Sequence, residues 1–155
     1  MFGIPRAPLI LGLAGLLPFL AGAIIASGAF NVRMGEVATG GYPLIVAADG
    51  TKTLIAYGTI ILSFMSGVLW GFATKANGRM ATTGYILSVL PALWAYTHGA
   101  SLPVPALINL IIGFVGLLAL DYVFFRQGLT PPWWMRLRVL LTAIVVLCLA
   151  IGIAG

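Results

Sequence analysis

Residues 102–124 read LPVPALINLIIGFVGLLALDYVF and include one charged side chain, Asp121. A helix needs about 20 mostly apolar residues to cross the hydrocarbon core of a membrane, and this stretch meets both requirements. Residues 8–29, 54–72, 81–96 and 135–154 are comparably apolar. The sequence therefore predicts an all-α membrane protein, a single domain over residues 1–155 formed by a bundle of five transmembrane helices.

The composition of the 155-residue chain supports this fold class. Hydrophobic residues make up 61% of the chain and charged residues 7%, whereas a soluble domain carries about 25% charged residues. Three acidic residues, one histidine and one cysteine are few groups for acid–base catalysis, metal ligation or nucleophilic attack. We therefore expect a protein that is not an enzyme, with no catalytic residues, no metal site and no cofactor.

The eight basic residues sort by side of the membrane. Arg33 and Lys52 fall in the one long loop, residues 30–53. The other six lie on the side of the N-terminus: Arg6, Lys75, Arg79, Arg126, Arg136 and Arg138. Because cytoplasmic segments are enriched in lysine and arginine, we expect a cytoplasmic N-terminus, an outer loop at residues 30–53 and a periplasmic C-terminus. The net charge of +5 is then explained by the orientation of the protein in the membrane. We therefore expect no nucleic-acid partner.

Small residues recur at every fourth position of the second predicted helix, at Ser63, Gly67 and Gly71. Residues four apart share one face of a helix, and a stripe of small side chains lets another helix approach closely. Packing inside the protein's own bundle is the simpler interpretation. A docking face for another protein is the alternative.

A carboxylate within a membrane span is by default a candidate functional group. Asp121 lies three residues from the end of its predicted helix, on the side that carries Arg126, Arg136 and Arg138. We expect a structural ion pair, in preference to a proton relay. Arg136 and Arg138 are the partners that would tie the fourth predicted helix to the fifth.

The second predicted helix also contains the stretch YGTIILSFMSGVLWG, residues 57–71. This stretch resembles the signature of an uncharacterised bacterial membrane-protein family that is related to mitochondrial transmembrane protein 69. Three other segments fit the same family: residues 17–19, residues 88–94, and Asp121 followed by matching residues between 128 and 142. The resemblance therefore covers nearly the whole chain. The signature residues that match are Tyr57, Ser63, Phe64, Gly67, Trp70, Gly71, Asp121 and Arg138.

The resemblance implies a helical protein of bacterial inner membranes, or of mitochondria, and it brings no established activity. We therefore expect a multi-pass protein of the bacterial inner (cytoplasmic) membrane. Its expected partners are membrane lipids and other integral membrane subunits.

The scarcity of reactive groups and the small-residue stripe lead to one functional hypothesis. We expect a non-catalytic accessory or assembly subunit of a larger inner-membrane complex, with an energy-transducing (respiratory or photosynthetic) complex as the favoured partner. Tyr57 and Trp70 would join the stripe in helix packing or interaction.

The alternative hypothesis is a small channel, carrier or lipid-handling membrane protein that acts alone or as a homo-oligomer. That hypothesis predicts a cavity lined by residues such as Tyr57, Ser63, Ser88 and Asp121.

Overall fold

The computed structural model describes residues 3–28, 47–98 and 102–155. All regular secondary structure in these ranges is helical, as predicted. The helices are α1 (Arg6–Ala14), α2 (Leu17–Ala26), α4 (Ala47–Ala73), α5 (Gly78–His98), α6 (Pro103–Arg126) and α7 (Trp134–Ala154).

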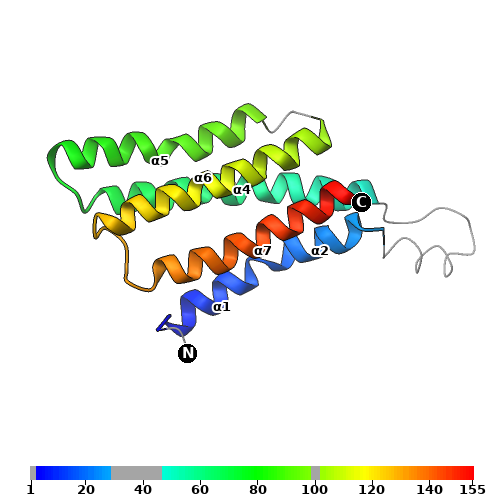
Figure 1. Ribbon diagram of the computed structural model, residues 1–155, viewed down its shortest axis with the longest axis horizontal. Coiled ribbons are helices and arrows are strands. Elements are labelled where there is room, and N and C mark those ends of the chain that lie inside the picture. Colours follow the sequence, from blue (N-terminus) through cyan, green and yellow to red (C-terminus); the bar gives the residue numbers. More distant parts are fainter. Residues whose placement is uncertain (1–2, 29–46, 99–101) are drawn as a thin grey trace, which may run out of the picture.

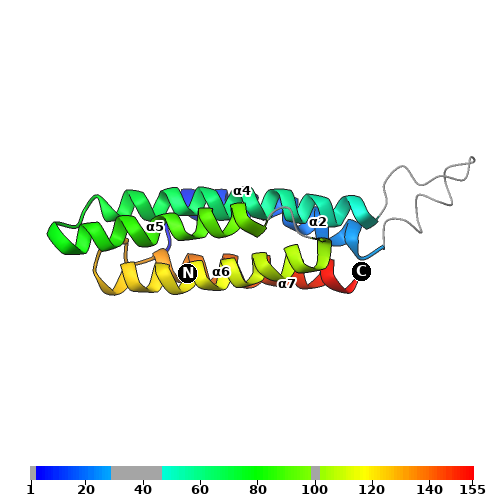
Figure 2. The same cartoon turned by 90° about the horizontal axis from the view of Figure 1, so that it is seen from above.

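The long helices run side by side along the long axis of the molecule and form two layers (Figures 1 and 2). Helices α2, α4 and α5 make one layer, and α6 and α7 make the other. The turns that join α4 to α5 and α6 to α7 lie at one end of the bundle, and the C-terminus lies at the opposite end. Consecutive long helices are therefore antiparallel, as expected for a chain that crosses a membrane repeatedly.

Four helical segments among the described residues are long and apolar enough to cross a membrane: Arg6–Ala26, Asp49–Ala73, Pro103–Arg126 and Trp134–Ala154. The structure thus supports four of the five predicted spans and a multi-pass membrane protein. Helix α5 contains the remaining predicted span, residues 81–96. Helix α5 has 21 residues, which is long enough to cross a membrane. Its first two turns contain Arg79, Thr82 and Thr83, so it is less apolar than the other four segments.

The start of α4 corrects the predicted boundary of the outer loop. Residues 47–53 belong to the helix rather than to the loop, and residues 29–46 lie outside the described residues. Asp49 lies in the first turn, where a carboxylate interacts favourably with the positive end of the helix dipole. The next residue, Gly50, packs so closely on α2 that an added Cβ would lie 2.3 Å from the backbone nitrogen of Ala26. Asp and Gly are common in turns, but here Asp49 and Gly50 lie in the first turn of α4, where the helix contacts α2.

The first predicted span, residues 8–29, is broken into α1 and α2 at Gly15 and Leu16. The cause is Pro18, whose ring nitrogen has no hydrogen to donate to the carbonyl of Ala14. Tyr57 of α4 stabilises the break, because its hydroxyl donates a hydrogen bond of 3.0 Å to the Gly15 carbonyl. Below the break, α1 packs on α7 and turns away from the other helices (Figure 1).

The core lies between the two layers and is built from large side chains that interlock with glycines. Phe19 is 1% exposed, and its ring contacts those of Tyr57 and Phe114 edge to face, with centroids 5.1 Å and 6.0 Å away. A Cβ added at Gly152 of α7 would lie 2.5 Å from Leu54 Cδ1. Glycine therefore sets how closely these helices approach.

Candidate functional site

Asp121 is the centre of a buried polar network near the end of the bundle that carries the α6–α7 turn. Its side chain is 0% exposed. Arg138 Nε of α7 lies 2.7 Å from Asp121 Oδ2, and the guanidinium-bearing side chain is 5% exposed. The indole Nε1 of Trp134, also in α7, donates a hydrogen bond of 2.8 Å to Asp121 Oδ1. Both carboxylate oxygens thus accept hydrogen bonds from the neighbouring helix.

The two other arginines that the sequence offers as partners are placed differently. Arg126 Nη1 donates to the hydroxyl of Tyr122, 3.4 Å away, and Arg136 is exposed. Arg138 therefore forms the ion pair with Asp121. The pair joins α6 to α7 across a buried contact of 2.7 Å, which is the geometry expected of a structural ion pair.

Aromatic and basic side chains extend the network to α4. The ring of Phe72 meets that of Trp134 edge to face, with centroids 5.0 Å apart. Lys75 Nζ lies 5.3 Å from the centroid of the Phe72 ring and donates a hydrogen bond of 3.3 Å to the carbonyl of Leu129. A continuous set of contacts therefore links Asp121 of α6 to α7 and, through Trp134, to α4 at this end of the bundle.

Two donors beside the ion pair have no hydrogen-bond partner. They are Nη2 of Arg138 and the hydroxyl of Thr142, and each residue is 4% exposed. Trp134, Arg138 and Thr142 are spaced four residues apart and share one face of α7. Sequence reasoning did not assign Trp134 or Thr142 to the site, although this spacing was a readable signal for both.

The small-residue stripe of Ser63, Gly67 and Gly71 lies on the exposed face of α4. A Cβ added at Gly67 or Gly71 would find no atom within 4 Å. The stripe therefore does not pack inside the described part of the bundle, and the simpler of the two interpretations is wrong. Other glycines, such as Gly22 and Gly152, make the close helix contacts instead.

Tyr57 and Trp70 have different environments. Tyr57 is half-buried, and its hydroxyl donates a hydrogen bond to the Gly15 carbonyl at the break between α1 and α2. Trp70 is 49% exposed and stacks at a tilt on Tyr85 of α5, with ring centroids 4.6 Å apart. Tyr57 thus has an internal packing role, whereas Trp70 remains partly open to the surroundings of the bundle.

Three cavities in the described structure bear on the channel hypothesis. None of them is lined by Tyr57, Ser63, Ser88 or Asp121. Ser88 is buried at the contact between α4 and α5, where its carbonyl accepts a hydrogen bond from Ser66. The four residues therefore do not share one of these cavities.

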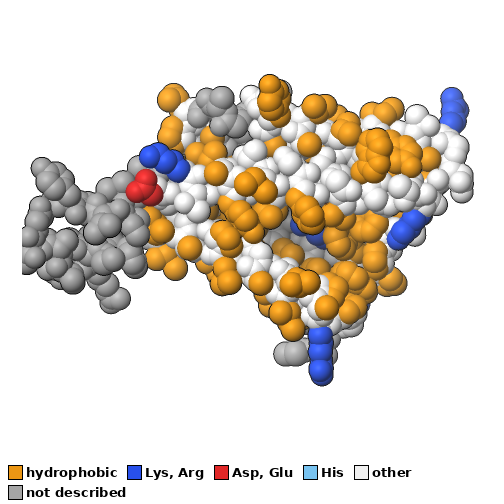
Figure 3. Space-filling model, turned by 180° about the vertical axis from the view of Figure 1, so that it is seen from behind, with side chains coloured by type: hydrophobic (Ala, Val, Ile, Leu, Met, Phe, Trp, Pro, Cys, Tyr) orange, Lys and Arg blue, Asp and Glu red, His pale blue; other side chains and the backbone are white. Residues whose placement is uncertain are grey.

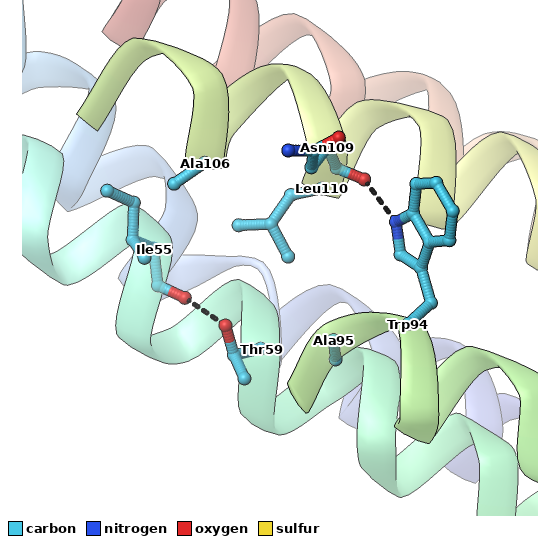
Figure 4. Close-up of a pocket in the computed structure, with 7 residues that line it drawn as sticks. All are labelled: Ile55, Thr59, Trp94, Ala95, Ala106, Asn109 and Leu110. Atoms are coloured by element: carbon cyan, nitrogen blue, oxygen red, sulfur yellow. Dashed lines mark hydrogen bonds between the residues drawn. The ribbon is translucent and has the colours of Figure 1, made fainter. Parts of the chain in front are cut away.

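The first cavity lies between α4, α5 and α6 and has a volume of about 10 Å³ (Figure 4). Two polar side chains in its lining are hydrogen-bonded, because Trp94 Nε1 donates to the Asn109 carbonyl and the Thr59 hydroxyl donates to the Ile55 carbonyl, each over 2.8 Å. This volume is at the lower limit for one water molecule. The cavity is therefore a packing gap.

A second cavity of about 280 Å³ lies between α5 and α6, and a third of about 160 Å³ lies between α1, α2, α4, α6 and α7. Residues such as Pro91 and Gly116 line the second, whereas Arg138 and Thr142 line the third. Within the described ranges, no group of three or more His, Cys, Asp or Glu side chains is placed to hold a metal ion.

Comparison with known proteins assigns the chain to a family. Residues 4–154 match the model of DUF3429, a family described as proteins of unknown function. Transmembrane protein 69 of Xenopus tropicalis is 34% identical over 150 residues, which cover 94% of this chain and 53% of that protein. Transmembrane protein 69 of Mus musculus is 30% identical over 145 residues, which cover 90% of this chain and 52% of that protein.

The chain thus spans about half the length of the curated relatives it matches. No solved structure matches it. The resemblance that was read from residues 57–71 is confirmed, and the chain belongs to the DUF3429 family of membrane proteins, which is related to transmembrane protein 69.

Proposed function

We propose that this protein is a non-catalytic accessory or assembly subunit of a larger membrane complex and joins it through the outward face of α4. The observation that carries the proposal is the exposed stripe of Ser63, Gly67 and Gly71. Contact with lipid tails does not require small side chains, because lipid tails adapt to the shape of a helix. Close contact with another helix does favour small side chains.

Large apolar side chains flank this stripe on the same face. Ile60 is 61% exposed and Phe64 is 64% exposed. The small residues let a neighbouring helix approach closely, and the larger apolar side chains beside them offer it contact area. The proposed occupant is therefore a transmembrane helix of another integral membrane subunit.

We further propose that α5 is the fifth span and that the N-terminus is cytoplasmic. Lys75 lies in the turn between α4 and α5, and Arg79 lies in the first turn of α5, at the end of the bundle where Arg126 ends α6. Lys52 lies in the first turns of α4, next to Asp49 at 3.6 Å. This charge distribution supports the orientation predicted by the positive-inside rule. The bacterial inner membrane as the location and an energy-transducing complex as the partner are proposed by analogy with the bacterial and mitochondrial proteins that the family resemblance implies.

Co-purification tests the proposal. A tagged full-length chain, expressed at its native level and extracted in mild detergent, should bring down other integral membrane proteins that mass spectrometry identifies. Gly67→Leu places a large side chain in the stripe, blocks the close approach of another helix and should remove them. Gly116→Leu is the matched control, because an added Cβ there also finds open space but lies on α6. Recovery of the wild-type chain as a lone monomer would contradict the proposal.

A further inference from the structure

The third cavity is the place where the structure signals a ligand. It has a volume of about 160 Å³ and opens on the face of the molecule seen in Figure 3, which is hollowed there and shows a basic side chain at the base of the hollow. Arg138 is the basic residue that lines this cavity. The cavity is open where α1 turns away from the other helices. Leu11, 72% exposed, and Phe64, 64% exposed, lie at the rim of this opening. The cavity therefore opens sideways, toward the lipid.

Two residues that line this cavity each carry a buried hydrogen-bond donor that has no partner. Nη2 of Arg138 and the hydroxyl of Thr142 are both buried and unpaired. A threonine in a helix ordinarily donates to the carbonyl four residues earlier, as Thr53 and Thr59 do over 2.8 Å. Thr142 makes no such bond. Because buried donors in native proteins are nearly always paired, two unpaired donors one turn apart indicate a missing acceptor.

The charge at the site restricts what that acceptor is. Asp121 already neutralises Arg138 through a contact of 2.7 Å, so a second full negative charge is not needed. The remaining walls are mainly apolar, with residues such as Phe19 and Val145. An uncharged acceptor attached to a hydrocarbon, such as a carbonyl group at the head of an apolar chain, matches both features.

The depth of the site is compatible with the ester carbonyl of a glycerolipid as the acceptor. Arg138 follows Trp134, the first residue of α7, by four residues, which places it about 6 Å along the helix axis. Tryptophan side chains in membrane proteins concentrate at the boundary between headgroups and acyl chains. The ester carbonyls of glycerolipids lie at this boundary. The volume is close to the roughly 150 Å³ of an apolar cavity that holds benzene, so it accommodates a short segment of one acyl chain.

We propose that this cavity is a binding site for one acyl chain of a membrane glycerolipid, with the ester carbonyl accepting hydrogen bonds from Arg138 Nη2 and Thr142 Oγ1. The bound lipid completes the polar network that begins at Asp121. This inference does not depend on the proposed role as a subunit, because it concerns a pocket within one chain.

Native mass spectrometry of the detergent-purified full-length chain tests the site with two probes of one headgroup. The first probe is a diacyl phosphatidylcholine, and the second is the corresponding dialkyl ether lipid, which lacks the ester carbonyls. We expect the diacyl lipid to bind more tightly, by about fivefold for each hydrogen bond that the ether cannot accept. Equal binding of the two lipids would overturn the proposal and indicate that water fills the cavity.

Variants link the binding to this cavity. Thr142→Val keeps the shape of the side chain and leaves the ion pair intact, and it should weaken diacyl binding about fivefold without affecting ether binding. Thr59→Val is the matched control and should leave the preference for diacyl lipid unchanged. An unchanged preference in Thr142→Val would also overturn the proposal.

A second pair of variants tests whether the lipid enters the cavity through this opening. Leu11→Trp places a large side chain at the rim and should reduce binding of both lipids. Leu17→Trp changes a similarly exposed residue, 63% exposed, that does not line the cavity, and should have no effect. Tighter binding of a short-chain quinone than of the diacyl lipid, lost in Thr142→Val, would reassign the carbonyl to a quinone and refute the assignment to a glycerolipid.

Discussion

Removal of the Asp121 carboxylate tests the structural role of the buried network most directly. In Asp121→Ala, Arg138 keeps its charge but loses its counterion, and Trp134 Nε1 loses its acceptor. The pair is nearly inaccessible, with side chains 0% and 5% exposed, so the substitution leaves a buried charge without its counterion. Breaking one partner of a buried pair costs about 3–5 kcal/mol. We therefore expect the free energy of unfolding to fall by about this amount.

A double variant distinguishes the contribution of the charges to stability from the contribution of the side-chain volume. Replacement of a buried pair by apolar side chains of similar volume is often neutral or stabilising. Asp121→Leu combined with Arg138→Met should therefore recover most of the stability lost in Asp121→Ala. The smaller change Trp134→Phe removes one hydrogen bond to a charged acceptor and should cost about 1.5–3 kcal/mol.

The chain provides its own probe for this measurement. Cys148 is its single cysteine and is 2% exposed, so a thiol-reactive dye labels it only as the bundle opens. The labelling midpoint should fall on heating or in denaturant for Asp121→Ala and return in the double variant. A midpoint for Asp121→Ala equal to that of the wild type, or a double variant less stable than the single one, would refute the reasoning.

Three further predictions concern the packing of the helices, and the same labelling assay measures each. Tyr57→Phe removes the hydroxyl that bonds the Gly15 carbonyl at the helix break, and it should cost about 1 kcal/mol; an unchanged midpoint would show that lipid or water satisfies that carbonyl. Gly152→Ala places a Cβ 2.5 Å from Leu54 Cδ1 and should cost about 1–3 kcal/mol; an unchanged midpoint would show that the leucine side chain rotates away at no cost. Gly67→Ala, with open space around the added Cβ, should instead stabilise the helix by up to about 1 kcal/mol, and destabilisation would contradict the exposed position of the stripe.

Hydropathy predicted the presence of each long helix, because the free energy of transferring a side chain into lipid is largely a local property. It placed helix boundaries less well. The start of α4 lies at Ala47, seven residues before the predicted span, because polar residues such as Asp49 are tolerated in a first turn. The break between α1 and α2 was readable in principle from Pro18, since a proline removes a hydrogen bond four residues upstream.

The candidate site was predicted only in part. Asp121 stood out because a carboxylate in an apolar stretch has few explanations. The choice of Arg138 over Arg126 and Arg136 required knowing the rotation of α7 against α6. That rotation depends on side chains from several helices, which no local pattern contains.

The sequence by itself determined the fold class, the approximate positions of the long helices and the one acid within a predicted span, Asp121, because each follows from the local cost of placing a side chain in lipid. The tertiary structure decided which way each helix face points. It directed the stripe of Ser63, Gly67 and Gly71 outward and brought Arg138 and Thr142 into a cavity that the turn of α1 leaves open. Helical spacing shows which residues share a face, whereas the rotation of that face is set by packing between segments distant in the sequence.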